Sequence, residues 1–182
     1  MKLLIITQKV DKTDTGALGF FHGWIEEFSK HVELLTVICL EKGKYEFPGN
    51  VKVLSLGKED GKSRLKYLKN FYGYIWRERK NYDTIFVHMN QEYILLAGWW
   101  WRVLGKKVLM WRNHKKGSWL TRLAVLISND VLCTSPDSFT ARFKKTRLMP
   151  AGINLAKFDT DRGLLRKPHS VLFAGRISKV KN

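Results

Sequence analysis

Short, uninterrupted apolar runs alternate with longer segments of helical periodicity along most of this chain. The first run, KLLIIT at 2–7, has no polar alternation, which is typical of a strand buried on both faces. The segment FFHGWIEEFSKH at 20–31 instead repeats apolar residues at helical spacing. This alternation predicts an α/β fold, a Rossmann-like doubly wound parallel sheet with helices on both faces.

The same patterns predict the order of the elements along the chain. Strands are expected at 2–7, 33–40, 50–56, 83–88, 106–111, 130–135 and 146–150. Helices are expected at 20–31, 63–81, 92–104, 118–128 and, as a short one, 135–143.

The helix expected at 63–81 carries an apolar stripe opposite its basic residues. The stripe consists of Leu65, Leu68, Tyr72, Ile75 and Trp76. An amphipathic helix of this kind packs its apolar side on the core, so we expect the stripe to be buried.

Ligands of open parallel sheets bind beyond the carboxyl ends of the strands. All strands of such a sheet end at one edge, so the loops that follow them meet there. We expect this rim to be formed by the loops after Thr7, His88, Arg112, Thr134 and Met149.

The loop after the first strand is rich in glycine but lacks the dinucleotide fingerprint. Its glycines, Gly16 and Gly19 with Gly23 in the next helix, have the spacing G-x-x-G-x-x-x-G, not G-x-G-x-x-G. Glu41 does end the second strand, where a ribose-binding acid would lie, but the glycine spacing argues against a nicotinamide cofactor. The loop is either an ordinary flexible turn or, as we favour, one whose backbone approaches a ligand closely.

Polar residues follow the fourth and fifth strands. His88 ends one strand, with Asn90 just after it, and Arg112, Asn113 and His114 follow the other. The two histidines lack a third ligand at suitable spacing, so we expect no metal site. They either cap backbone groups or serve as polar contacts or proton carriers for a substrate.

The chain is strongly basic, with a net charge of +17 and a pI of about 10.0. Such a charge attracts polyanions: nucleic acid, phosphorylated ligands or an anionic membrane surface. Cys39 and Cys133 each lie in an apolar run, which indicates buried thiols in a cytosolic protein and not a disulfide framework.

The segment Tyr93–Asn129 contains no Asp or Glu and mixes cations with tryptophans. Its tryptophans are Trp99, Trp100, Trp101, Trp111 and Trp119. This mixture suits an anionic membrane interface or single-stranded nucleic acid. The alternative is that several of the tryptophans belong to the core and the cations form a solvated face. The apolar run YILLAGWWW is about half the length of a spanning helix, so no transmembrane segment is expected.

Two motifs near the C-terminus belong together. The first is MPAGINLAKF, with Pro150, Gly152, Ile153, Asn154, Lys157 and Phe158, and the second is VLFAGRISKVKN, with Gly175, Arg176 and Lys181. With this spacing the sequence resembles the family 4 glycosyltransferases, which are retaining enzymes of the GT-B fold. The resemblance implies an N-terminal acceptor-binding domain at 1–158, a linker at 159–168 and the start of a C-terminal donor-binding domain at 169–182.

The resemblance also implies roles for individual residues. Arg176 and Lys181 would bind the diphosphate of a nucleotide-sugar donor, approached from the other domain by the backbone of Gly16 and Gly19. Bidentate arginine and a lysine point charge suit an anionic leaving group. The family uses neither a divalent metal nor another cofactor. The paired glutamates that contact the donor in that family lie beyond Asn182, so we expect this chain alone to be inactive.

The acceptor side is implied in the same way. His114 matches the family's strand-end histidine near the reacting sugar, and His88 matches it less well. Asn90, Arg112 and Asn113 are expected to contact the acceptor. The implied partners are a nucleotide-sugar and a lipid-linked or glycan acceptor, for an enzyme that is cytoplasmic or peripheral on the inner face of the plasma membrane.

Two other classes of function compete with this hypothesis. One is a stand-alone domain that binds a glycan or lipid without catalysis. The other is a basic nucleic-acid-binding module, although the chain has no helix-turn-helix, zinc-finger or RNP-type motif.

Overall fold

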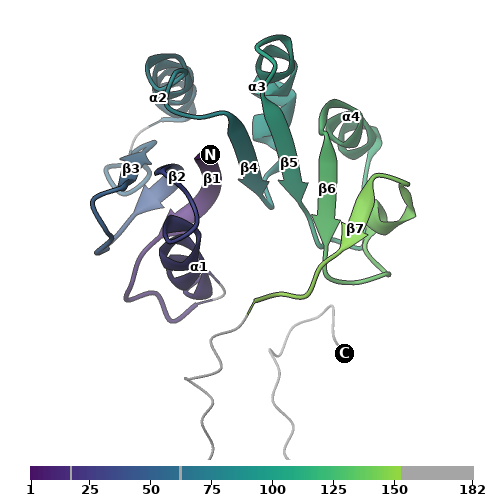
Figure 1. Ribbon diagram of the computed structural model, residues 1–182, viewed down its shortest axis with the longest axis horizontal. Coiled ribbons are helices and arrows are strands. Elements are labelled where there is room, and N and C mark those ends of the chain that lie inside the picture. Colours follow the sequence, from purple (N-terminus) through teal and green to yellow (C-terminus); the bar gives the residue numbers. More distant parts are fainter. Residues whose placement is uncertain (17, 62, 153–182) are drawn as a thin grey trace, which may run out of the picture.

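The computed structural model describes residues 1–16, 18–61 and 63–152. In this part of the chain a seven-stranded sheet has the order β3-β2-β1-β4-β5-β6-β7 (Figure 1). Every neighbouring pair is parallel. The strands are β1 (Lys2–Val10), β2 (Leu34–Lys42), β3 (Val51–Ser55), β4 (Thr84–His88), β5 (Lys107–Trp111), β6 (Asp130–Cys133) and β7 (Thr146–Leu148). The Rossmann-like α/β fold predicted from the sequence is confirmed.

Helices cover both faces of the sheet. They are α1 (Phe20–Ser29), α2 (Arg64–Arg77), α3 (Gln91–Val103) and α4 (Trp119–Ile127), and the short helix expected at 135–143 is a 3-10 turn, η1 (Phe139–Arg142). Helix α1 lies on one face, and α2, α3 and α4 lie on the other (Figure 1).

Two hydrophobic cores follow from this arrangement. Strand β1 alternates its side chains, with Leu3 and Ile5 in the core beneath α1 and Leu4 and Ile6 in the core beneath the other helices. A strand buried on both faces reads as a continuous apolar run, which explains the sequence pattern KLLIIT.

The face that α2 buries differs from the expected one. Phe71 is completely buried and Ile75 nearly so, whereas Leu65 is 79% exposed and Trp76 is 60% exposed. Helix α2 is apolar on more than one side, and Phe71 rather than Tyr72 packs against the core formed with Tyr93 and Trp101. Except at Ile75, the predicted stripe is therefore wrong, and an apolar surface is left facing outward.

The tryptophans divide between the core and the surface. Trp101 and Trp111 are buried, while Trp99 and Trp119 are 59% and 71% exposed. Both cysteines are buried and free, as predicted. The described residues form no helix that is long and apolar enough to cross a membrane. The linker at 159–168 and the segment 169–182 lie outside the described residues, as does the end of the first predicted domain.

Candidate functional site

The carboxyl ends of the parallel strands lie along one edge of the sheet, as expected. Strand β1 is longer than predicted, because Lys9 and Val10 still pair with Glu41 and Lys42 of β2. The first loop of the rim therefore begins after Val10 and not after Thr7. The polar residues Gln8 and Lys9 end the apolar run but leave the backbone pairing intact.

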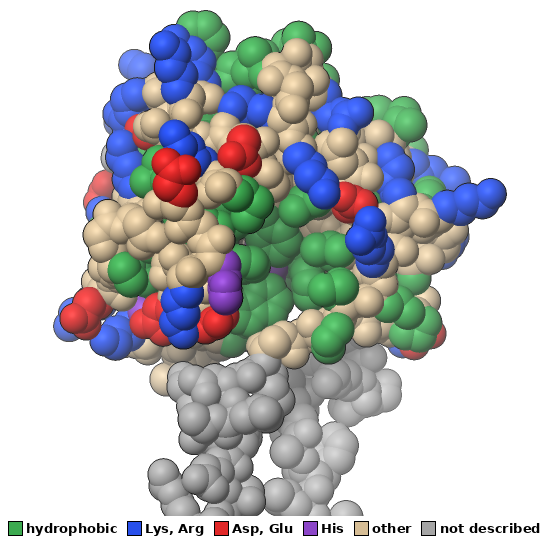
Figure 2. Space-filling view, in the orientation of Figure 1, with side chains coloured by type: hydrophobic (Ala, Val, Ile, Leu, Met, Phe, Trp, Pro, Cys, Tyr) green, Lys and Arg blue, Asp and Glu red, His purple; other side chains and the backbone are tan. Residues whose placement is uncertain are grey.

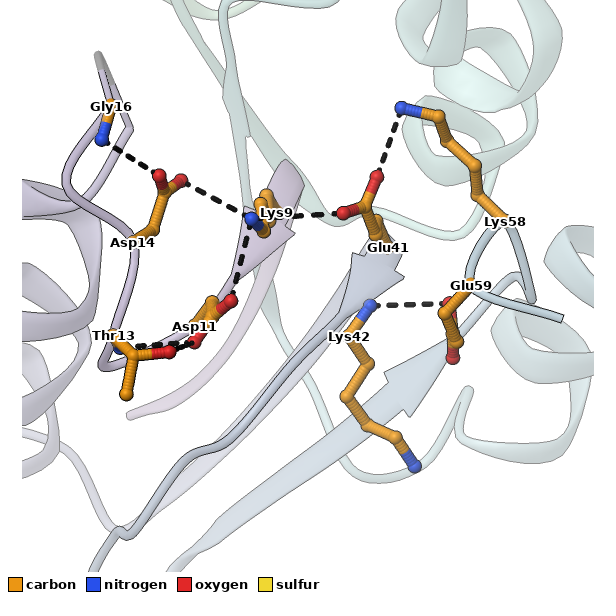
Figure 3. Close-up of polar contacts among 9 residues, drawn as sticks. All are labelled: Lys9, Asp11, Thr13, Asp14, Gly16, Glu41, Lys42, Lys58 and Glu59. Carbon is orange, nitrogen blue, oxygen red and sulfur yellow. Dashed lines mark hydrogen bonds and ion pairs between the residues drawn. The ribbon is translucent and has the colours of Figure 1, made fainter.

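An ion-pair network holds this first loop (Figure 3). The Lys9 ammonium lies 3.3 Å from a carboxylate oxygen of Asp11 and 3.6 Å from oxygens of Asp14 and Glu41. Lys58 binds the other oxygen of Glu41 at 2.9 Å. Lys9 thereby ties both acids of the loop to the end of β2.

Asp11 also shapes the turn locally. Its carboxylate accepts hydrogen bonds from the Thr13 backbone N–H at 2.9 Å and from the Thr13 hydroxyl at 2.8 Å. These bonds stabilise the ionised form, and they lower the pKa of Asp11. An Asp bonded to the backbone two residues on is an ordinary turn signal. The spacing in DKTD is the sequence signal that could have identified this cluster.

Gly16 and Gly19 lie in the same loop, and their backbone donors are already used. The Gly16 N–H donates to the Asp14 carboxylate at 2.8 Å, and the Gly19 N–H donates to the Gly16 carbonyl at 3.2 Å. A Cβ atom at Gly19 would lie 1.9 Å from the Asp14 carbonyl oxygen, so the close turn requires glycine. An anion that binds the Gly16 N–H must displace the Asp14 carboxylate.

His88 is buried beneath α1, with a side chain only 1% exposed. Its ring stacks on Phe21 with 4.2 Å between centroids, and its Nδ1 lies 3.3 Å from the Thr7 hydroxyl. Desolvation lowers the pKa of His88 to about 4, so the imidazole is neutral at pH 7. In this arrangement a substrate at the rim does not reach His88.

Asn90 follows His88 across a backbone turn. Met89 has a φ of 68°, in the left-handed region, which turns the chain toward α3. The half-buried Asn90 accepts a hydrogen bond from the Gln8 side chain at 2.8 Å. This contact links the ends of β1 and β4.

The loop after β5 is held by its own polar residues. The Arg112 guanidinium donates to the carbonyl of Lys116 at 3.1 Å and to that of His114 at 3.4 Å. Asn113 accepts a hydrogen bond at 2.7 Å from the Thr134 backbone N–H at the end of β6. Arg112 and Asn113 thus support the loop structurally.

Two hydroxyl groups that the sequence did not single out complete this support. Ser138 and Thr140, at the start of η1, donate to the Arg112 carbonyl at 3.1 and 3.0 Å. A Cβ atom at Gly117 would lie 2.1 Å from the Phe139 ring, so only glycine lets the loop pack there.

The His114 imidazole is exposed on this loop. Its Nδ1 lies 3.0 Å from both the N–H and the carbonyl oxygen of Lys116. Among the described residues, no hydrogen-bond partner is found for its Nε2, which leaves that atom available to a ligand. Lys115 and Lys116 add positive charge beside it.

The structure therefore brings part of the expected site together. His114, Arg112 and Asn113 form one loop, Asn90 lies on the adjacent strand end, and His88 lies below the surface. Arg176 and Lys181 fall outside the described residues. Within residues 1–152 that are described, no group of three or more His, Cys, Asp or Glu is arranged to hold a metal ion.

The seven-stranded parallel sheet with helices on both faces is a Rossmann-like α/β fold, and it is similar to half of a solved GT-B glycosyltransferase. A matching solved structure is the crystal structure of MurG, a GT-B glycosyltransferase, from Acinetobacter baumannii. The match has a TM-score of 0.55 at 9% sequence identity and covers 91% of this chain and 50% of that chain. The chain thus spans about half the length of that protein, and the likeness establishes the fold. No family model and no curated protein sequence matches the chain.

Proposed function

We propose that this chain is the N-terminal, acceptor-binding half of a family 4 retaining glycosyltransferase. The enzyme would transfer a sugar from a nucleotide-sugar donor to a lipid-linked or glycan acceptor. The main supporting observation is the exposed His114 imidazole, presented by a braced loop at the carboxyl rim of a GT-B type sheet.

The proposed transfer would divide its tasks between the two halves of the enzyme. The nucleoside diphosphate leaves as an anion, so stabilising its developing charge is a central task of the site. Arg176 and Lys181 would supply that charge from the donor half, and His114 Nε2 would contact the reacting sugar. Arg112 and Asn113 are committed to backbone groups, so they would act on the acceptor mainly by positioning the His114 loop.

The test is a ligand titration of the 182-residue chain followed by backbone NMR. A glycan or lipid-linked acceptor is expected to shift the amides of residues 112–118, and the chain alone is expected to transfer no sugar from any nucleotide-sugar. Sugar transfer by this chain alone would contradict the proposal that catalysis requires a separate donor-binding half. Acceptor binding that leaves 112–118 unchanged and shifts another surface would refute the assigned site.

A stand-alone glycan- or lipid-binding domain is the second candidate. The observation that favours it is the Gly16 N–H, which is occupied by the Asp14 carboxylate and so is not open to a donor phosphate. The native protein distinguishes the two functions, because a binding domain would hold the acceptor without any sugar transfer.

A further inference from the structure

A cavity with both polar and apolar walls lies between the loop after β6, the 3-10 turn η1 and strand β7, at one end of the carboxyl rim. It has a volume of about 450 Å³, which lies within the range of small-molecule sites. Its walls include Pro136, Asp137, Ser138, Ala141, Arg142 and Leu148. A carboxylate and a guanidinium beside apolar carbons suit a ligand with hydroxyl groups on a carbon ring, such as a sugar.

The two charged groups of the cavity are not committed to each other. No ion pair joins Asp137 to Arg142, and no described residue donates to the Asp137 carboxylate. The Asp137 backbone N–H donates to the Ser135 hydroxyl at 3.2 Å, and Arg142 Nε donates to the Phe139 carbonyl at 3.0 Å. The Asp137 carboxylate can therefore accept hydrogen bonds from hydroxyl groups, while the outer nitrogens of Arg142 can donate to an anion.

A second guanidinium approaches the same place from α4. The guanidinium carbon of Arg142 lies 4.3 Å from the centre of the Phe139 ring, and that of Arg122 lies 5.8 Å from it. The Phe139 backbone N–H donates to the His114 carbonyl at 2.9 Å. Both guanidinium groups therefore lie close to the His114 loop as well as to the cavity.

Positive charge in this region is not balanced by acids. The segment 93–129 contains no Asp or Glu, and Asp130 is bound by Lys107 and Arg147. Figure 2 shows basic side chains over α4 and η1, at the right of the view. Unbalanced cations of this kind attract an oxyanion. Four cations of the region form no ion pair with a described residue: Lys115, Lys116, Arg122 and Arg142.

We propose that the cavity and the cations beside it bind a sugar that carries a phosphate, and that this sugar phosphate is the acceptor of the transfer. The sugar ring would occupy the cavity and donate hydrogen bonds from its hydroxyl groups to Asp137, and the phosphate would accept from Arg122 and Arg142. The role as acceptor rests on the function proposed above, whereas the binding itself does not.

A nucleic acid also offers phosphates, but it fits this place less well. Base stacking requires exposed aromatic faces, and no aromatic side chain is among the described residues that line the cavity. The Phe139 ring beside it is only 8% exposed and lies against the Arg142 guanidinium. A sugar ring instead needs a hydroxyl acceptor and apolar carbons, which Asp137, Pro136 and Ala141 supply.

The test is isothermal titration calorimetry of the 182-residue chain with hexose 1-phosphates and 6-phosphates, the parent hexoses and inorganic phosphate. We expect at least one hexose phosphate to bind about tenfold or more tightly than its parent hexose and than inorganic phosphate. Binding of no hexose phosphate, or equal binding of the parent hexose or of inorganic phosphate, would refute the site. An octyl ester on the phosphate distinguishes a lipid-linked sugar phosphate, which should then bind more tightly, from a free one.

Two substitutions separate the phosphate contact from the sugar contact. Arg142→Gln should weaken binding of both the hexose phosphate and inorganic phosphate by about tenfold, through loss of a charge-assisted hydrogen bond. Asp137→Asn should weaken binding of the hexose phosphate by about fivefold and leave that of inorganic phosphate unchanged. A merely structural role for Asp137 would lower both affinities together. Arg102→Gln removes an exposed arginine on α3 and is the matched control, with less than about twofold change expected.

An assay of the two-domain enzyme separates this inference from the proposed function. Sugar transfer to a neutral acceptor that Arg142→Gln leaves unchanged would keep the function and overturn the phosphorylated acceptor. An enzyme that binds a hexose phosphate at this site but transfers no sugar would keep the binding site and overturn the function. Tighter binding of an oligonucleotide than of any hexose phosphate would assign the cations to nucleic acid instead.

Discussion

His88 ends β4 and His114 follows the neighbouring strand β5, yet the environments of the two side chains are opposite. His88 lies under α1, stacked on Phe21 and 1% exposed, whereas His114 lies on an exposed loop. The strand pattern is the same in both cases, so the difference arises from what covers the strand end. A polar residue at the rim can serve the fold or the ligand, depending on the helix above it.

The largest expected effect is that of replacing the exposed histidine, His114. In the two-domain enzyme proposed above, His114→Ala should reduce sugar transfer by about 10²- to 10³-fold, the range for loss of one polar group that contacts the reacting centre. The free energy of unfolding should change by less than about 0.5 kcal/mol, because the side chain is exposed. The matched control is His31→Ala, which removes an exposed histidine paired with Glu27 on α1. Equal losses of sugar transfer from both substitutions would show that His114 has no special role in the reaction.

The buried histidine, His88, should instead make the stability of the fold depend on pH. The pKa of His88 is about 4 in the folded protein and about 6.5 in the unfolded chain, so between these values the unfolded state binds the extra proton. This contribution to stability is complete above pH 6.5 and is lost as the pH falls toward 4, by about 3 kcal/mol in total. Urea denaturation across this range measures it.

Two variants test whether His88, and not His114, causes this pH dependence of stability. His88→Gln should flatten the pH dependence between 6.5 and 4, and His114→Ala should leave it as in the unsubstituted protein. A His88→Gln protein with the full pH dependence would show that another group causes it.

A smaller effect on stability is expected from the packing of Gly117 against Phe139 in the His114 loop. In Gly117→Ala the new methyl group would meet the Phe139 ring, and overpacking of this kind costs about 1 to 3 kcal/mol. Gly23→Ala is the control, since nothing lies within 4 Å of its Cβ position and the change favours a helix by about 0.5 to 1 kcal/mol. The melting temperatures of both variants test this. A Gly117→Ala protein with an unchanged melting temperature would mean that the loop rearranges to accommodate the methyl group.

The smallest expected effect on the whole fold is that of Lys9→Met. This substitution removes the cation that joins Asp11, Asp14 and Glu41, so the first loop should open locally. Hydrogen exchange of the loop amides should become faster, while amides of the sheet remain protected. Lys12→Met, which removes an exposed pair with Glu46, is the control and should leave the loop unchanged. Unchanged exchange in Lys9→Met would show that the Asp11 turn alone holds the loop.

The sheet could be predicted from the sequence because its strands are buried on both faces and read as apolar runs. Helix α2 was harder, since it is apolar on two sides and only tertiary packing selects Phe71 over Tyr72. The burial of His88 depends on where α1 lies over the sheet, which no local pattern reports. The Lys9 network joins residues from separate segments, so its geometry depends on the pairing of β1 with β2.

The most direct test is to isolate the native protein from its source cells with an antibody to residues 1–152 and to assay sugar transfer. We expect a protein of about twice the mass of this chain, as a second domain of similar size requires. It should transfer sugar from a nucleotide-sugar to a lipid or glycan acceptor, and its His114→Ala form should do so about 10²- to 10³-fold more slowly. A native protein that binds the acceptor but transfers nothing from any nucleotide-sugar would contradict this function.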